Sequence, residues 1–101
     1  MSVMNIGKNN FENEVINSNK KVLVDFYASW CGPCRMLSPI IEEIANERED
    51  IKVVKINVDA EPELSAQYGI MSIPTLMVFE SGKIIHQMMG ARPKDDILDM
   101  L

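Results

Sequence analysis

Hydrophobic residues along this chain follow two spacings, one typical of buried strands and one typical of helices. Residues 22–27 and 51–58 are rich in apolar side chains, as expected for strands that are covered on both faces of a sheet. Between them, a helix through Ala45 is predicted by apolar residues that recur every three or four positions, namely Met36, Leu37, Ile40, Ile41 and Ile44. The first apolar run is therefore expected at the centre of a sheet.

The shorter segments in the first two thirds of the chain are marked mainly by their ends. Residues 4–6 predict a short edge strand. Asn9, followed three positions later by Glu12, predicts a helix N-cap with its capping-box partner. Pro62 fits a first helical turn and Gly69 a left-handed helix end, so the two bracket another short helix.

The last third predicts a hairpin and a final helix. Ser81-Gly82 is a tight-turn signal between strands at 75–79 and 83–85. Pro93 starts a helix expected to end with the chain. The resulting order β-α-β-α-β-α-β-β-α implies an α/β fold, a three-layer α/β/α sandwich around a mixed five-stranded sheet with helices on both faces.

Length, composition and charge limit the classes of function. The 101 residues, 47% of them hydrophobic, suit a single domain over 1–101 with a substantial core. Fifteen acidic against ten basic residues give a net charge of -5. Since no Lys/Arg cluster could follow a phosphate backbone, neither nucleic acid nor a membrane is expected as a partner.

The N-terminal residues turn polar within a few positions, and no segment approaches a transmembrane length. We therefore expect a cytoplasmic location. Thiols are kept reduced in the cytoplasm, so a pair of cysteines there is more often catalytic or metal-binding than structural.

Both cysteines lie in the run Trp30-Cys31-Gly32-Pro33-Cys34. Two thiols three positions apart can close a small disulfide and open it again, which indicates dithiol redox chemistry. Because Cys31 falls between a strand and a helix, its sulfur is expected at the helix N-terminus, where unpaired N–H groups and the dipole favour a thiolate. Cys31 is the candidate nucleophile. Cys34, one turn later, is the candidate resolving thiol, because its attack is intramolecular.

Three other readings of the cysteines are weaker. A structural disulfide closing so short a loop would contribute only about 2 kcal/mol. A zinc site needs more ligands than two cysteines and the distant His86, so no metal is expected. Arg35 occupies the position where a haem-attachment motif requires histidine.

Asp25 interrupts an otherwise apolar strand. Burial there would raise the pKa of its carboxyl group and suit it to accept a proton from Cys34. The alternative is a solvated residue at a strand end.

Taken together, these motifs resemble the thioredoxin family over essentially the full length of the chain. The residues that carry the resemblance are Val24-Asp25-Phe26-Tyr27-Ala28, Trp30-Cys31-Gly32-Pro33-Cys34, Pro39, Lys55-Ile56-Asn57-Val58-Asp59, Tyr68-Gly69-Ile70, Ile73-Pro74-Thr75 and Gly90-Ala91. Several motifs in the family's order are much more specific than one Cys-x-x-Cys pair.

The resemblance implies roles for residues whose spacing alone leaves them open. Asp25 would be buried with Lys55 beside it to tune it, although by spacing Lys55 fits a solvated charge equally well. Pro74 would be cis and face the disulfide, leaving the backbone of Ile73 free to pair with a substrate strand; proline also suits a plain strand boundary. The family's flat apolar docking patch corresponds here to Trp30, Gly32, Pro33, Ile73, Gly90 and Ala91, whereas by itself Trp30 also fits an ordinary core.

The function implied is that of a general protein-disulfide reductase that maintains cell redox homeostasis. Its partners would be a thioredoxin reductase and disulfide-containing substrate proteins, and it would act as a monomer with no bound cofactor beyond the redox-active Cys31–Cys34 disulfide. The two residues between the cysteines, Gly32 and Pro33, include no histidine, so the disulfide is expected to be stable and the dithiol strongly reducing. The competing hypothesis is a non-enzymatic thioredoxin-like binding module, which would need neither the two cysteines nor Asp25.

The chain departs from common family members at Tyr27, where a second tryptophan is frequent, and at Ser72, where glycine is frequent. Met71, Met88 and Met89 lie close in sequence to the docking segments. They either fill gaps in the core or form an adaptable apolar rim for substrates.

Overall fold

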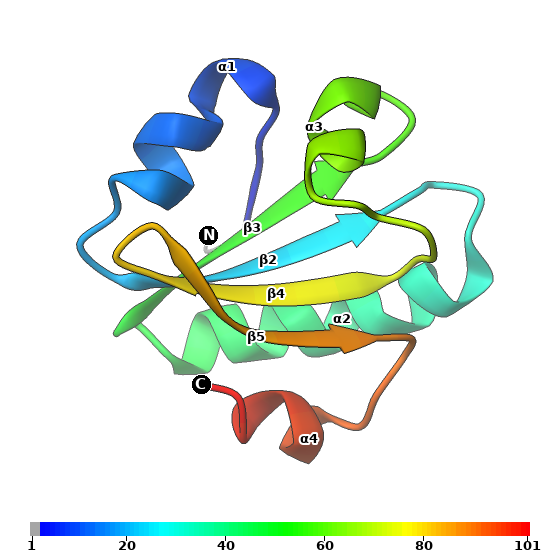
Figure 1. The fold of residues 1–101 in the computed structure, drawn as a ribbon. Coiled ribbons are helices and arrows are strands. Elements are labelled where there is room, and N and C mark those ends of the chain that lie inside the picture. The colour runs from blue at the N-terminus through cyan, green and yellow to red at the C-terminus, as the bar shows by residue number, and fades with distance from the viewer. Residues whose placement is uncertain (1–2) are drawn as a thin grey trace.

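The computed structural model describes residues 3–101 and arranges five strands in one mixed sheet with helices on both faces (Figure 1). The strand order is β1-β3-β2-β4-β5. In chain order the elements are β1 (Val3–Asn5), α1 (Lys8–Phe11), η1 (Glu12–Ile16), β2 (Lys21–Tyr27), α2 (Gly32–Glu47), β3 (Ile51–Asn57), α3 (Pro62–Gln67), β4 (Thr75–Glu80), β5 (Lys83–Met89) and α4 (Lys94–Leu98).

Strand β2 lies at the centre of the sheet, as its apolar sequence predicts. It pairs in parallel with β3 and antiparallel with β4, and β4 forms the predicted hairpin with β5. Strand β1 is the other edge and runs parallel to β3. The α/β fold class and the element order are therefore confirmed.

Alternate residues of β2 face the two helical layers. Val22, Val24 and Phe26 pack with residues of α1 and α3, such as Phe11 and Leu64. Leu23 faces the other side and packs against α2 and α4. Since successive strand residues point to opposite faces, Asp25 shares the face of Leu23 and projects toward α2.

The beginning of the first helix differs from the sequence prediction. The Asn9–Glu12 cap is wrong, because α1 already begins at Lys8, where the Lys8 N–H donates to Oε1 of Glu61 over 2.9 Å. The Gly7 N–H donates to Oδ1 of Asn10 over 2.8 Å. A distant carboxylate thus serves the helix end, and local sequence does not reveal it.

The C-terminal elements also differ in length from the prediction. Strand β5 runs on to Met89, and most of its side chains are exposed. Helix α4 ends at Leu98 rather than with the chain. An exposed edge strand lacks the apolar alternation on which the sequence prediction rests. This explains why the predicted strand ends at residue 85, before the observed end of β5.

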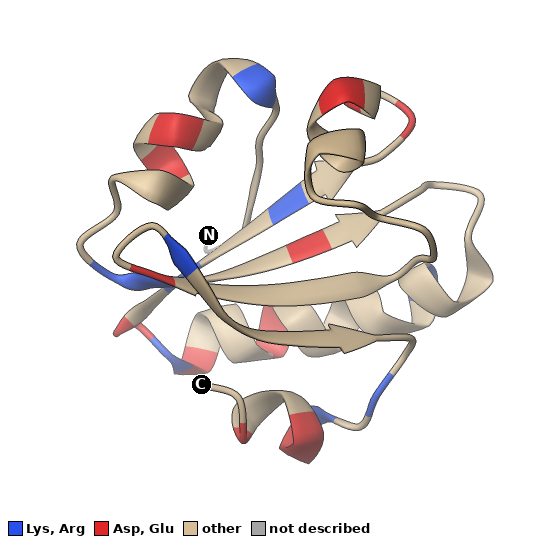
Figure 2. Ribbon diagram, viewed as in Figure 1, with Lys and Arg blue, Asp and Glu red and all other residues tan. Residues whose placement is uncertain are grey.

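Charged positions lie mostly on the outer helices and turns in Figure 2, and the loop that joins β2 to α2 contains none. Within residues 3–101, none of the helices combines the length and apolar character needed to cross a membrane.

The β4–β5 turn should tolerate a side chain less well than the end of α3. Gly82 has φ 80°, and a Cβ there would lie 3.1 Å from the carbonyl oxygen of Ile16; Gly69 has φ 65° with open space around it. Gly69→Ala should lose about 1 kcal/mol of unfolding free energy for the left-handed backbone alone, and Gly82→Ala distinctly more. Urea denaturation of both variants checks this, and equal losses would contradict the close approach of η1 to the turn.

Candidate active site

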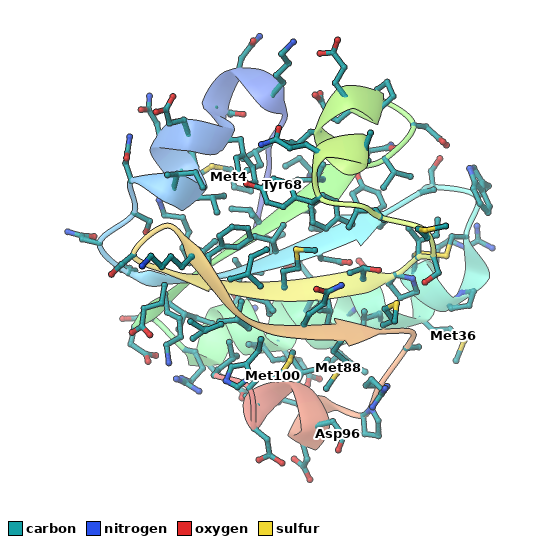
Figure 3. All side chains as sticks on the ribbon, viewed as in Figure 1. Met4, Met36, Tyr68, Met88, Asp96 and Met100 are labelled. Carbon is teal, nitrogen blue, oxygen red and sulfur yellow. A yellow bond between two sulfur atoms is a disulfide. The ribbon has the colours of Figure 1, made fainter. Side chains whose placement is uncertain are left out.

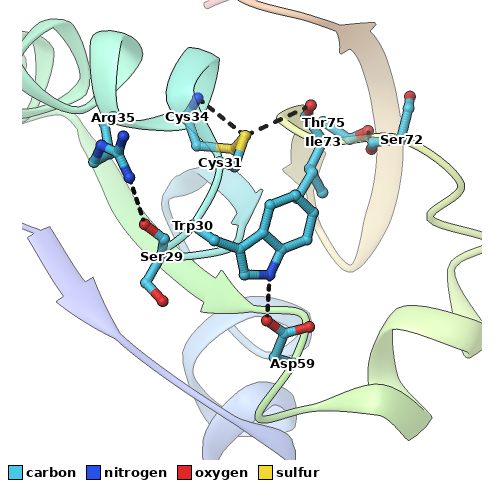
Figure 4. Close-up of a disulfide and its surroundings, with 9 residues drawn as sticks. All are labelled: Ser29, Trp30, Cys31, Cys34, Arg35, Asp59, Ser72, Ile73 and Thr75. Carbon is cyan, nitrogen blue, oxygen red and sulfur yellow. Dashed lines mark hydrogen bonds between the residues drawn. A yellow bond between two sulfur atoms is a disulfide. The ribbon is translucent and has the colours of Figure 1, made fainter.

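Cys31 and Cys34 form a disulfide at the junction of β2 and α2. Their Cα atoms are 5.2 Å apart. Cys31 is the N-cap of α2, and its Sγ accepts the backbone N–H of Cys34 over 3.2 Å (Figure 4). The sulfur thus occupies the place where a helix N-terminus favours negative charge.

The loop before β4 lies against Cys31. The Cys31 Sγ is 3.9 Å from the carbonyl oxygen of Ile73, and the Ile73–Pro74 peptide bond is cis. The Gly90 N–H donates to the carbonyl oxygen of Pro74 over 2.8 Å, and the Thr75 hydroxyl donates to that of Ser72 over 2.7 Å. These bonds fix the loop beside the disulfide and bring Gly90 to it.

Trp30 stands beside the disulfide with 67% of its surface exposed. Its indole Nε1–H donates to Oδ2 of Asp59 over 2.7 Å, which fixes the ring (Figure 4). A groove of about 210 Å³ next to it is lined by Trp30, Val58, Ile70, Met71, Ser72 and Ile73. Its mostly apolar walls fit an extended, uncharged segment of a partner protein.

Asp25 is completely buried, and neither carboxylate oxygen has a hydrogen-bond partner within residues 3–101. Burial raises the pKa of its carboxyl group to about 7, against a smaller lowering by the charge of Lys55. Lys55 is its register partner on β3 and projects to the same face of the sheet. A carboxyl group in this state can exchange a proton near neutral pH.

A second cavity, of about 190 Å³, opens on the side of Cys34. Its lining residues are Tyr27, Ala28, Ser29, Cys34, Arg35, Ser38 and Lys55. The Lys55 ammonium donates to Oγ of Ser38 over 3.1 Å, and Nη1 of Arg35 donates to the carbonyl oxygen of Ser29 over 3.0 Å. The disulfide therefore lies between an apolar groove near Cys31 and a second cavity near Cys34, at whose wall the Lys55 ammonium and the Ser38 hydroxyl meet.

The remaining sequence candidates are dispersed around this centre. Gly32 and Pro33 form the first turn of α2, and Ala91 is exposed after β5. His86 is exposed on β5, and the described residues contain no group of three His, Cys, Asp or Glu that could hold a metal ion.

The methionines near the docking segments divide between the core and the surface. Met88 is half-buried and packs on the cluster that contains Met100, and Figure 3 shows both between β5 and α4. Met71 is 94% exposed at the apolar groove, and Met89 is 55% exposed. Figure 3 also shows Met36 pointing outward from the start of α2.

Sequence reasoning did not single out Asp59 or Ser38 as site residues. Asp59 follows β3 and reaches Trp30 only in the folded chain. Ser38 did carry a signal: it follows Cys34 by four positions, the spacing that puts two side chains on one helix face.

Comparison with known proteins agrees with this geometry. The family model described as thioredoxin matches residues 2–101. The chain is 54% identical to a thioredoxin of Pyropia yezoensis, over 100% of the chain and 95% of that protein. It is 54% identical to one of Porphyra purpurea (96% and 92% covered) and 52% identical to one of Chlorobaculum thiosulfatiphilum (87% and 82% covered).

Removing the Asp25 carboxyl should change how stability depends on pH. The folded-state pKa of about 7 lies above the unfolded value of ~3.9, so the stability that the protonated group retains at low pH is lost as pH rises through 7. The free energy of unfolding of Asp25→Ala, relative to that of the wild type, should therefore rise by up to roughly 4 kcal/mol between pH 4 and pH 8.5. This is the free-energy equivalent of the pKa difference. Urea unfolding at both pH values measures it.

Any cost of the cavity left by the alanine is the same at both pH values, so only the change in the difference matters. A difference between the two proteins that stays constant with pH would show that Asp25 ionises equally in the folded and unfolded states.

Proposed function

Because the chain belongs to the thioredoxin family, whose members are protein-disulfide oxidoreductases, we propose that it serves as a general reductant of protein disulfides. Dithiol–disulfide exchange takes place at Cys31 and Cys34. The observation that carries the proposal is the position of Cys31 Sγ, which caps α2 beside an apolar groove.

Cys31 begins the reaction as the nucleophile. Its thiolate attacks one sulfur of the substrate disulfide, forms a mixed disulfide and releases the other substrate sulfur as a thiolate. Cys34 then attacks Cys31 Sγ, the mixed disulfide breaks, and the second substrate thiol leaves. Two electrons pass from the dithiol to the substrate, and Cys31 and Cys34 end as a disulfide.

Asp25 accepts the proton that Cys34 must lose before it attacks. The carboxyl group projects from β2 toward α2, has no hydrogen-bond partner among the described residues, and has a pKa raised to about 7 by burial. The last two features support this role, because a carboxylate that already accepted hydrogen bonds would have a lower pKa and be a weaker base. Lys55 tunes Asp25 through its charge, and Gly32 and Pro33 tune the disulfide.

Substrates dock along Trp30, Ile73 and Pro74, with Gly90 and Ala91 at the margin. The exposed indole of Trp30 and the apolar groove beside it support this assignment. The backbone of Ile73 would pair with an extended substrate segment, as in strand addition to a sheet edge.

The cell would recycle the oxidised form through a thioredoxin reductase. A reducing compartment suits such a cycle, because thiols persist there, so we place the protein in the cytoplasm. It would act there as a monomeric single domain over residues 1–101.

The two cysteines should fail differently when each is replaced. Cys31→Ser and Cys34→Ser should both reduce turnover of a protein disulfide to background. Only Cys34→Ser should accumulate a mixed disulfide, because Cys31 still attacks but is not resolved. Mass spectrometry of the alkylated, unreduced products separates the variants, and adducts on Cys34 in the Cys31→Ser protein would reverse the assignment.

The dithiol should also behave as a strong reductant. Equilibrated with glutathione, the Cys31–Cys34 pair should remain oxidised in fairly reducing buffers, with each ~30 mV changing the ratio about tenfold. The reduced protein should turn over an exposed disulfide when a thioredoxin reductase and its electron source are supplied. A Cys31–Cys34 disulfide that is reduced as readily as that of a periplasmic oxidase would indicate an oxidase or isomerase instead. No turnover with any reductase would favour a binding module.

A further inference from the structure

The Lys55 ammonium lies beside a buried carboxyl group without pairing with it. Asn5, Lys55 and Asp25 are register partners across β1, β3 and β2, so Lys55 stands between the other two. Yet no ion pair joins Lys55 to Asp25, whose oxygens have no partner within residues 3–101. Some other group must therefore determine where this ammonium lies.

Ser38 provides that contact. The Lys55 Nζ donates to Oγ of Ser38 over 3.1 Å, and the bond is partly buried. Ser38 follows Cys34 by four positions on α2, so both side chains lie on the helix face that covers the sheet. Ser38, Lys55 and Cys34 line the same cavity of about 190 Å³.

Tyr27 holds the ammonium from a second side. The Lys55 Nζ lies 4.4 Å from the centre of the Tyr27 ring, within the range of a cation–π contact. The Tyr27 hydroxyl donates to Oδ1 of Asn5 over 3.0 Å, so the ring spans from β2 to β1 across Lys55. The ammonium is confined between the ring and Ser38.

We propose that Ser38 is a positioning residue, whose hydroxyl keeps the Lys55 ammonium inside the cavity where it balances the single negative charge that Asp25 and Cys34 share. This inference rests on the proposed role of Asp25. When Cys34 gives its proton to Asp25, the S–H bond breaks, a carboxyl O–H bond forms, and the negative charge passes from the carboxylate to the sulfur. A fixed ammonium faces that charge in both states.

Without the Ser38 hydroxyl, the half-buried lysine should extend into water, as long charged side chains do when nothing holds them. Asp25 would then lose a favourable charge and ionise at higher pH. Other groups facing this region are the thiol of Cys34 on α2 and the guanidinium of Arg35 at the cavity wall, while β4 contributes the apolar Leu76 opposite Asp25.

The test is the titration of the Asp25 carboxyl, followed by carbon NMR in the oxidised protein, together with the pH profile of the resolving step. Lys55→Met should move both midpoints upward by roughly one pH unit, as expected for loss of a nearby opposite charge. Ser38→Ala should move them upward by about half as much, and Ser38→Thr, which keeps the hydroxyl, should restore them.

Two comparisons isolate the mechanism. In the Lys55→Met background, Ser38→Ala should cause no further shift, because no ammonium remains to be held. Ser29→Ala should leave the titration unchanged, since that serine lines the same cavity but contributes only its backbone oxygen, to Arg35.

An unchanged or lowered midpoint in Ser38→Ala would overturn the proposal, and so would an equal shift with and without Lys55. Because the NMR titration needs no catalysis, it tests Ser38 even if the protein fails to turn over substrates. Failure of turnover with normal titrations would count against the proposed reductase function instead.

Discussion

A sulfur atom caps helix α2, and the active site is arranged around that contact. Cys31 Sγ accepts the N–H of Cys34 at the point where the central strand leads into the helix. A helix N-terminus presents unpaired N–H donors and the positive end of the helix dipole. It therefore stabilises a thiolate at the N-cap position, which a polar side chain usually occupies. In the proposed reaction Cys31 acts before Cys34, because the capping sulfur lies beside the groove and Cys34 lies inside the helix.

The two sides of the disulfide offer different environments, and in the proposed function one side binds the substrate while the other serves proton transfer. On one side, Trp30 and Ile73 border an apolar groove that suits a docked segment. On the other, the Lys55 ammonium and the Ser38 hydroxyl are hydrogen-bonded at the wall of a cavity next to Cys34. Asp25 lies buried beneath α2 with a raised pKa. In the proposed reaction, a docked substrate would cover the groove and leave the cavity open for proton exchange.

The sequence predicts those features that depend on local pattern. The apolar run of β2 and the helical spacing after it place the sheet centre and α2, and the position of Cys31 between them predicts its place at the helix end. Contacts between distant segments escape such reasoning. Glu61 caps α1 from the start of α3, Asp59 fixes Trp30, and Ser38 holds Lys55. Each joins residues at least 17 positions apart, so no periodicity or motif reports it.

The central claim, that the sulfur at the end of α2 is the attacking one, can be measured directly in the reduced protein. Solvent access does not by itself distinguish the thiols, because Cys31 and Cys34 are 4% and 3% exposed in the disulfide form. Brief alkylation with iodoacetamide at neutral pH, resolved by peptide mass spectrometry, compares their thiolate reactivity. We expect Cys31 to react at least about tenfold faster than Cys34. Equal rates, or faster reaction of Cys34, would contradict the account.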